Sequence, residues 1–154
     1  VLMNCTASPA NTKQKAEYTE TVSLLRELDA YPDSLVTITV KAFAGKTTEN
    51  AKPSVVEYIK SIVKDVDPKS VSWAIESVVT LREDQHKLLN TIKKPVLVMT
   101  GEEDRTFSIE ETKAMADSIP NAIFKVLPKV GHLAALEAPD LINQEIDDFL
   151  KIIR

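Results

Sequence analysis

The sequence has few of the residues that mark disulfide-rich, membrane-spanning or nucleic-acid-binding proteins. Only one of its 154 residues is cysteine, so an intrachain disulfide is excluded and a reducing compartment is favoured. No apolar run approaches the roughly 20 residues that span a bilayer, and no basic block suggests nucleic acid. With a net charge of -4 and 27% charged residues, the chain is expected to be globular and cytoplasmic, without nucleic-acid or membrane partners.

The C-terminal part of the chain alternates between strand and helix patterns. Pro95–Thr100 and Ala122–Leu127 are short apolar runs, which are typical of strands buried on both faces of a parallel sheet. Helices are predicted after them, one capped by Ser108 with Glu111 completing a capping box, and one over Ala138–Ile153. This repeat predicts an α/β fold with parallel strands and right-handed crossovers.

Helical patterns dominate the stretch between residues 12 and 92. Ser34–Ala44 is ambiguous, because its β-branched residues favour a strand while the spacing of its apolar residues fits a short helix. Gly45–Lys52 is polar and predicts a loop, and Val1–Asn4 predicts a short buried strand. The predicted helices follow Thr12 (with Thr12 as cap and Tyr18, Val22, Leu25 and Leu28 inward), Pro53, Pro68 (with Val71, Ala74, Ile75, Val78 and Val79 inward) and Glu83.

Asp104 and His132 each follow one of the two C-terminal strand patterns. Because loops at the carboxyl ends of parallel strands form the ligand site of such sheets, both side chains are expected at one edge. A carboxylate beside an imidazole is the pairing that orients a histidine general base. We therefore predict a hydrogen bond between them. The alternative is a loop histidine and a surface aspartate in an ordinary α/β domain.

Two segments around these residues resemble the α/β-hydrolase family. Lys94–Asp104 (KPVLVMTGEED) resembles the late strand that ends in the triad acid, and Val130–Pro139 (VGHLAALEAP) resembles the loop of the triad histidine. In the second segment, the Gly-His pair followed by Glu-x-Pro is typical of the esterase, lactonase and peptidase branches of the family. Val1–Thr6 resembles the strand after the nucleophile helix, and Thr12–Asn90 resembles the helical lid, so the resemblance covers nearly the whole chain.

The resemblance implies the C-terminal portion of an α/β-hydrolase fold, with a parallel sheet remnant and an inserted helical lid. Residues 1–11 would form a core strand and loop, residues 12–92 the lid, and residues 93–154 the core that carries the site. It also implies that Asp104 is the acid and His132 the base of a triad acting on a small acyl substrate, without cofactor or metal.

The family's nucleophile is missing from this sequence. That nucleophile is a serine in a Gly-x-Ser-x-Gly elbow, and no serine stands two residues from any of the three glycines, Gly45, Gly101 and Gly131. The elbow and the oxyanion segment would lie upstream of Val1, so the chain alone is predicted to be inactive. Two other residues are considered as the nucleophile. Cys5 lacks a glycine-flanked turn, and helix capping is a sufficient explanation for Ser108. Ser108 also stands where the family often has a proline, a few residues after the acid.

Four other groups are weighed for a role. Trp73 is the candidate substrate-contacting residue of the lid, and it fits the core of the lid equally well. His86 is expected to be exposed in a charged helix. Glu102 and Glu103 are expected to form a solvated acidic turn, and Glu137 is expected to cap or bridge at the last helix.

Two functions of different classes fit the sequence. The first is the C-terminal part of a serine hydrolase for ester, lactone or related acyl substrates, inactive until the missing N-terminal half docks. The second is a non-catalytic fragment or interaction module that self-associates through the lid and the open edge of the Val1–Asn4 strand. A stable monomer argues against the second, and an obligate dimer supports it.

Overall fold

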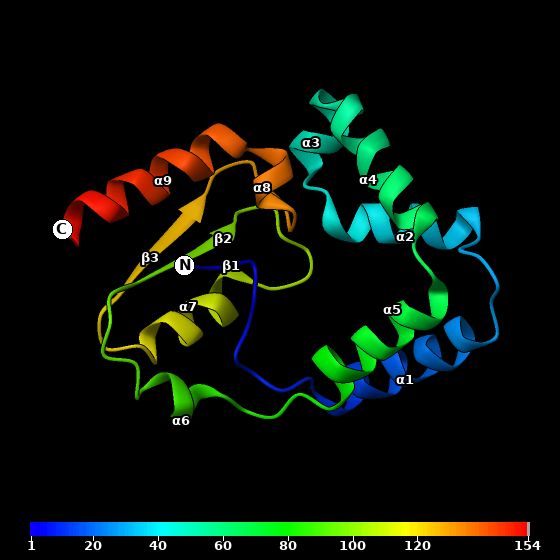
Figure 1. Cartoon of the computed structure of the whole chain (residues 1–154), viewed down its shortest axis with the longest axis horizontal. Helices are drawn as coiled ribbons and strands as arrows, with labels where there is room; N and C mark the ends of the chain where they lie inside the picture. The colour runs from blue at the N-terminus through cyan, green and yellow to red at the C-terminus, as the bar shows by residue number, and fades with distance from the viewer. Residues whose placement is uncertain (154) are drawn as a thin grey trace.

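The computed structural model describes residues 1–153 and contains a three-stranded sheet in the order β1-β2-β3 (Figure 1). The strands are β1 (Leu2–Met3), β2 (Val96–Gly101) and β3 (Ala122–Leu127). Both pairings are parallel, and Leu2, Val98 and Phe124 lie in one row across the sheet. The predicted α/β architecture with a short parallel sheet is therefore confirmed.

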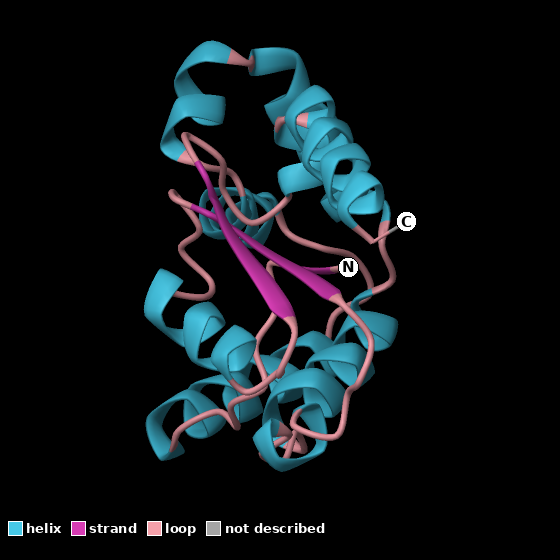
Figure 2. Cartoon of the chain, turned by 90° about the vertical axis from the view of Figure 1, so that its left-hand side faces the viewer, coloured by secondary structure: helices cyan, strands magenta, loops and turns pink. Residues whose placement is uncertain are grey.

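The central strand β2 is buried on both faces by helices. Leu97 and Met99 pack with α9 (Pro139–Ile152) on one face, and Val98 packs with α7 (Ile109–Asp117) on the other. Alternate side chains of a strand point to opposite faces, so a continuous apolar run is needed where both faces are covered. Each of these buried side chains contributes about 1.5–3 kcal/mol of hydrophobic free energy. Figure 2 shows the strands running between the two helical layers.

The prediction that Ala122–Leu127 is a buried strand is only half right. It forms β3, but β3 lies at the end of the described sheet, and Lys125 and Val126 are exposed. Lys125 pairs there with Glu145 of α9 at 3.2 Å. An edge strand with a charged residue resists pairing with another chain, which explains the lysine in an otherwise apolar run.

A helical segment (residues 12–89) connects β1 to β2. Its elements are α1 (Thr12–Arg26), α2 (Asp33–Phe43), α3 (Lys46–Ala51), α4 (Pro53–Asp65), α5 (Pro68–Ile75), the π-helix η1 (Glu76–Thr80) and α6 (His86–Leu89). α1 packs against α5 and α2 against α4, to one side of the sheet (Figure 1). The segment has its own apolar cluster, centred on Leu25, Val40 and Ile59. None of the helices in residues 1–153 is long and apolar enough to cross a membrane.

Several predictions within the helical segment are corrected. The cap of α1 is Asn11 and not Thr12, because Asn11 forms a reciprocal capping box with Gln14. The ambiguous stretch is the helix α2, since Val36 and Val40 share the face that packs into the cluster. Tyr18 was predicted to face inward but is 36% exposed, although its spacing places it on the same helical face as the buried Val22 and Leu25.

Two further predictions in this segment are wrong. Gly45–Lys52 was predicted to be a loop but contains α3, whose Thr48 is fully buried against a carboxylate from outside the segment. Ala74 and Val78 were predicted to face inward but are exposed: the inward face of α5 runs through Ser72, which is 0% exposed, and Val78 lies beyond α5 in the π-helix η1. Tertiary contacts overrode local propensity at both places.

The C-terminal elements follow the sequence pattern closely. The closing helix begins at Pro139 and is preceded by the short helix α8 (Ala134–Glu137). Ser108 caps α7 as predicted, accepting a hydrogen bond from the backbone N–H of Glu111 at 3.1 Å. The side chain of Glu111 does not close the expected capping box, because its Oε1 accepts from the Thr6 hydroxyl at 3.0 Å.

Candidate active site

The loops after β2 and β3 are packed directly against each other. Glu103 N–H donates to the Val130 carbonyl at 2.8 Å, which joins the loop of Asp104 to the loop of His132. A Cβ atom on Gly101 would lie 2.2 Å from the Val130 carbonyl oxygen. Only glycine therefore allows the two loops to approach so closely.

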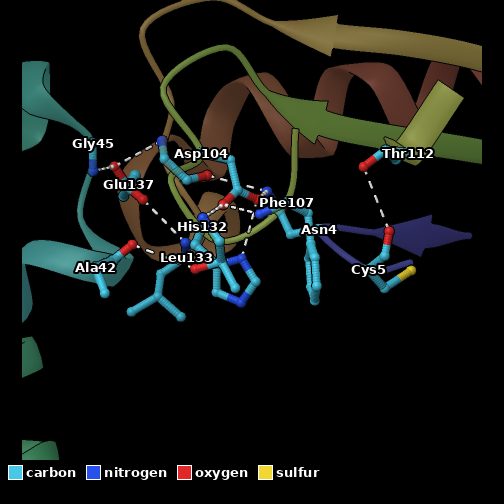
Figure 3. Close-up of polar contacts among 12 residues, drawn as sticks. Asn4, Cys5, Ala42, Gly45, Asp104, Phe107, Thr112, His132, Leu133 and Glu137 are labelled. Carbon is cyan, nitrogen blue, oxygen red and sulfur yellow. Dashed lines mark hydrogen bonds and ion pairs between the residues drawn. The ribbon is translucent and has the colours of Figure 1, made fainter. Parts of the chain in front are cut away.

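Asp104 and His132 form the hydrogen bond that the sequence predicted. His132 Nδ1 lies 3.0 Å from Asp104 Oδ2 (Figure 3). The Asp104 side chain is 0% exposed and the His132 side chain 18%, so the acid is covered while the imidazole keeps some access. The other oxygen, Oδ1, accepts from the backbone N–H groups of Thr106 at 2.8 Å and Phe107 at 3.2 Å.

The surroundings keep the Asp104 carboxyl ionised. Burial raises its pKa, but hydrogen bonds from His132, Asn4 and Thr106 outweigh the burial, and the pKa lies below its ordinary value. An ionised carboxylate at Nδ1 holds the proton on that nitrogen and leaves Nε2 as the proton acceptor. Nε2 has no hydrogen-bond partner within residues 1–153.

Two phenylalanine rings frame the imidazole. Phe43 of α2 stacks on His132 with ring centroids 5.2 Å apart, and Phe107 meets it edge-on at 5.6 Å. The backbone N–H of His132 also donates to the backbone carbonyl of Phe43 at 2.9 Å. The guanidinium of Arg82 lies 5.9 Å from the Phe107 ring centroid. These contacts hold the ring orientation and shield its faces from water.

Glu137 ties the histidine loop to the helical segment. Its side chain is 1% exposed and accepts hydrogen bonds from the residues on both sides of His132 and from the α2–α3 junction (Figure 3). The donors are Gly45 N (2.9 Å), Thr48 Oγ1 (2.7 Å), Gly131 N (3.0 Å) and Leu133 N (3.0 Å). A buried carboxylate is tolerated when its lone pairs are satisfied in this way. Glu137 was expected to cap or bridge at the last helix, but its carboxylate bridges the histidine loop and α3 instead.

The expected solvated turn of Glu102 and Glu103 is wrong for Glu103. Its carboxylate accepts from the backbone N–H of Thr47 at 2.6 Å and from the Thr47 hydroxyl at 2.7 Å. Burial raises the pKa of Glu103, but the contacts with Thr47 and the charge of Arg105 bring it below its ordinary value. The acid loop is thus also anchored to α3.

Asn4 is a site residue that the sequence analysis missed. It is 8% exposed and has φ 48°, so the chain turns there and β1 ends one residue before the predicted strand does. Its Nδ2 donates to Asp104 Oδ2 at 2.9 Å and to the Gly131 carbonyl at 3.2 Å (Figure 3). The available signal was an asparagine, a residue that tolerates positive φ, directly after an apolar strand.

The other candidate residues lie apart from this pair. Trp73 is 63% exposed on α5, so it is not lid core, and its contact with substrate stays a prediction. Burial raises the pKa of the Cys5 thiol, which makes it a weak nucleophile at neutral pH. His86 is less exposed than expected, 27% for its side chain, with Nδ1 2.8 Å from Asp84 Oδ1. Residues 1–153 contain no cluster of three His, Cys, Asp or Glu side chains arranged to hold a metal.

The chain also matches the model of a known protein family. A profile of the alpha/beta hydrolase fold matches residues 10–139. The chain belongs to the α/β-hydrolase family. The match covers the whole helical segment and both loops of the site, which agrees with the resemblance seen in the sequence.

Curated relatives of this α/β hydrolase are themselves hydrolases. An uncharacterized hydrolase of Bacillus subtilis, YugF, is 39% identical over 71 residues, which are 46% of this chain and 25% of that protein. The 2-hydroxy-6-oxononadienedioate/2-hydroxy-6-oxononatrienedioate hydrolase of Paraburkholderia phymatum is 39% identical over 62 residues, 40% of this chain and 22% of that protein. The matched segments thus span about a quarter of each relative.

Solved structures of α/β hydrolases superpose on nearly the whole chain. A thermophilic esterase from Thermogutta terrifontis has a TM-score of 0.88 and 27% identity, covering 99% of this chain and 55% of its own. The enol-lactonase from Burkholderia xenovorans has a TM-score of 0.82 and 18% identity, covering 97% and 54%, and shows the fold alone. The chain therefore spans about half the length of these proteins.

Proposed function

We propose that this chain carries the acid and the base of a serine hydrolase, with Asp104 and His132 as two members of a Ser-Asp-His triad. The observation that supports the proposal most strongly is the 3.0 Å hydrogen bond from His132 to a buried aspartate, which leaves Nε2 unengaged. The third member is a serine on a segment of the parent protein that precedes Val1, and the chain alone is therefore inactive.

In the proposed reaction, His132 Nε2 takes the proton from the serine hydroxyl as its oxygen attacks the carbonyl carbon of the substrate. Asp104 stabilises the imidazolium, which then gives its proton to the leaving group; the bond from the acyl carbon to that group breaks, and the acyl group stays on the serine as an acyl-enzyme. A water molecule is deprotonated by the same Nε2, attacks the acyl carbon, and the proton returns to the serine oxygen. Asp104 stays ionised throughout, in keeping with its lowered pKa.

The proposed substrates are esters, lactones or related acyl compounds, and the helical segment serves as the lid over them. The esterase among the similar structures favours this class. Phe43 and Phe107 on either side of His132 would give the substrate an apolar wall. The proposal also includes the cytoplasmic location that is expected from the sequence.

The test restores the missing segment. The N-terminal half of the Thermogutta terrifontis esterase is fused ahead of Val1, and hydrolysis of a short aryl ester is measured for fusions that melt cooperatively. We expect hydrolysis in the fusion and a loss of roughly 10⁴-fold in kcat for Asp104→Asn and for His132→Ala. A fusion that keeps its rate after His132→Ala would refute the triad assignment.

The chain without any fusion provides the second arm. It is expected to hydrolyse the ester no faster than its own His132→Ala variant. A clear rate that disappears in the variant would mean that a nucleophile lies within these residues, and Cys5→Ser and Ser108→Ala would then identify it.

A second candidate function is association through the sheet edge. Within the described sheet β1 pairs only with β2, and Val1 beside it is 59% exposed, which favours an interaction module. Light scattering after gel filtration tests it: a dimer that Leu2→Pro converts to monomer would support it, and a monomeric wild-type chain would exclude it.

A further inference from the structure

The Asn4 side chain connects the loop of the acid and the loop of the histidine to the end of β1. Its two amide hydrogens point to two different loops, one to Asp104 Oδ2 at 2.9 Å and one to the Gly131 carbonyl at 3.2 Å. Asp104 Oδ2 is also the oxygen that meets His132 Nδ1. Gly131 directly precedes His132, so Asn4 contacts both sides of the acid–base pair.

The conformation of Asn4 is unfavourable for a residue that only fills space. Its φ of 48° lies in the left-handed region, which glycine would adopt without steric cost. Its Oδ1 is buried and has no hydrogen-bond partner in residues 1–153, and an unpaired buried acceptor also opposes folding. Glycine would avoid both costs, so the two donated hydrogen bonds are the contribution that only the amide makes.

The orientation of the amide is fixed by its neighbours. Turning the group over would place Oδ1 against Asp104 Oδ2 and against the Gly131 carbonyl, so that three acceptors would face one another. With Nδ2 in that position, the carboxylate cannot rotate about its own axis without losing a hydrogen bond from Asn4. Terminal carboxylate torsions are otherwise broad, and rotation would take Oδ2 away from His132 Nδ1.

We propose that Asn4 is a positioning residue of the acid–base pair: its amide holds Asp104 Oδ2 against His132 Nδ1 and fixes the Gly131 carbonyl beside the imidazole. The consequence for catalysis rests on the function proposed above, whereas the effect on the hydrogen bond is a property of this chain and is measured without a nucleophile.

The test is proton NMR of the 154-residue chain in water, observing the Nδ1 proton of His132. His132→Ala and His86→Ala assign the two histidine signals, since His86 also has Nδ1 close to a carboxylate. We expect a downfield His132 signal that exchanges slowly in the wild type. In Asn4→Gly, which keeps the backbone turn without its strain, the signal is expected to broaden or vanish. A sharp Asn4→Gly signal at the wild-type position would overturn the proposal.

Two variants separate positioning from general damage. Thr100→Val changes another buried polar residue, whose Oγ1 has no partner, and should leave the His132 signal unchanged. Asn4→Asp keeps the size of the side chain but sets an acid against Asp104 Oδ2, so the pair must bind a proton. The His132 signal of Asn4→Asp should therefore shift or broaden relative to the wild-type signal recorded at the same pH. A wild-type signal at every pH contradicts the proposal even if Asn4→Gly does not fold.

The esterase fusion distinguishes failure of this proposal from failure of the function. Asn4→Gly should lower kcat roughly 10- to 100-fold with KM little changed, because a misplaced base slows proton transfer. If His132→Ala abolishes activity while Asn4→Gly keeps full kcat, the triad stands and the positioning role falls. If His132→Ala keeps activity, the function falls and the NMR result alone decides the role of Asn4.

Discussion

The molecule contains two histidine–aspartate pairs in two different settings, and only one of them looks like a catalytic pair. His132 and Asp104 come from loops 28 residues apart in sequence, and their Nδ1–Oδ2 distance is 3.0 Å. His86 and Asp84 are two residues apart, with Nδ1 and Oδ1 at 2.8 Å. By distance alone, the second pair is the tighter one.

The difference lies in what surrounds each aspartate. The Asp104 side chain is 0% exposed and held by donors on both oxygens, whereas the Asp84 side chain is 62% exposed. An exposed local pair rearranges freely and is screened by water, while a buried pair between two anchored loops has one geometry. Fixed loops and burial, rather than the hydrogen bond itself, therefore identify the site.

The largest effect should come from removing the anchor behind His132. Glu137→Ala leaves four donors around a buried space without an acceptor, and we expect the free energy of unfolding to fall by about 3 kcal/mol or more. Urea denaturation followed by circular dichroism measures this. Asp84→Ala, in the exposed pair, should leave the free energy of unfolding nearly unchanged. If Glu137→Ala and Asp84→Ala lowered the free energy of unfolding equally, the buried and the exposed sites would not differ in the way described.

Acid should weaken the buried pair next. Since the pKa of Asp104 is lowered on folding, its contribution to stability is complete above the unfolded-state pKa of about 3.9 and disappears as pH falls through the lower folded-state pKa. Asp104→Asn should therefore cost about 1.5–3 kcal/mol at neutral pH, and the difference from wild type should shrink as the solution is acidified. Urea midpoints across this range test it. A cost that persists in acid would mean that charge is not what stabilises the pair.

A smaller effect is expected from the aromatic frame. Phe107→Leu removes the ring edge that lies against His132 while keeping an apolar side chain. The loss should be about 0.5–1.5 kcal/mol beyond the change in buried area. A double-mutant cycle with His132→Ala isolates this interaction, and a coupling energy of zero would show that the ring contributes only bulk.

The smallest effect concerns a strained backbone position next to the site. Lys129 has φ 59°, and its N–H donates to Glu102 Oε2 at 3.0 Å. Lys129→Gly relieves the strain and keeps this donor, so stability should rise by up to about 1 kcal/mol. Lys129→Ala is the matched control and should stay near wild type in thermal unfolding. A destabilised glycine variant would show that the lysine side chain matters more than the turn.

The same two regions show what the sequence could predict. The loops of Asp104 and His132 were found because buried parallel strands have a continuous apolar pattern, and such strands bring their carboxyl ends together. Asn4 and Glu103 were not placed correctly, because each acts through a partner about 55 to 100 residues away. The same reason explains α3, where a polar sequence becomes helical against Glu137. Local patterns predict elements, whereas contacts between distant segments decide the details of the site.

The crossing of Gly45 and Gly131 has a consequence for anyone redesigning this fold. A Cβ on Gly131 would lie 2.2 Å from the Gly45 nitrogen, and a Cβ on Gly45 would lie 2.8 Å from the Gly131 nitrogen. The two backbones therefore meet in a tight joint, and a side chain at either glycine would push them apart. The helices α1, α2, α4 and α5, which lie before and after Gly45 in the sequence, are built around their own apolar cluster. A graft can exchange the other helices of the segment for foreign ones, provided that it keeps the joint, the Phe43 ring against His132 and the α3 threonines that anchor the loops of the site.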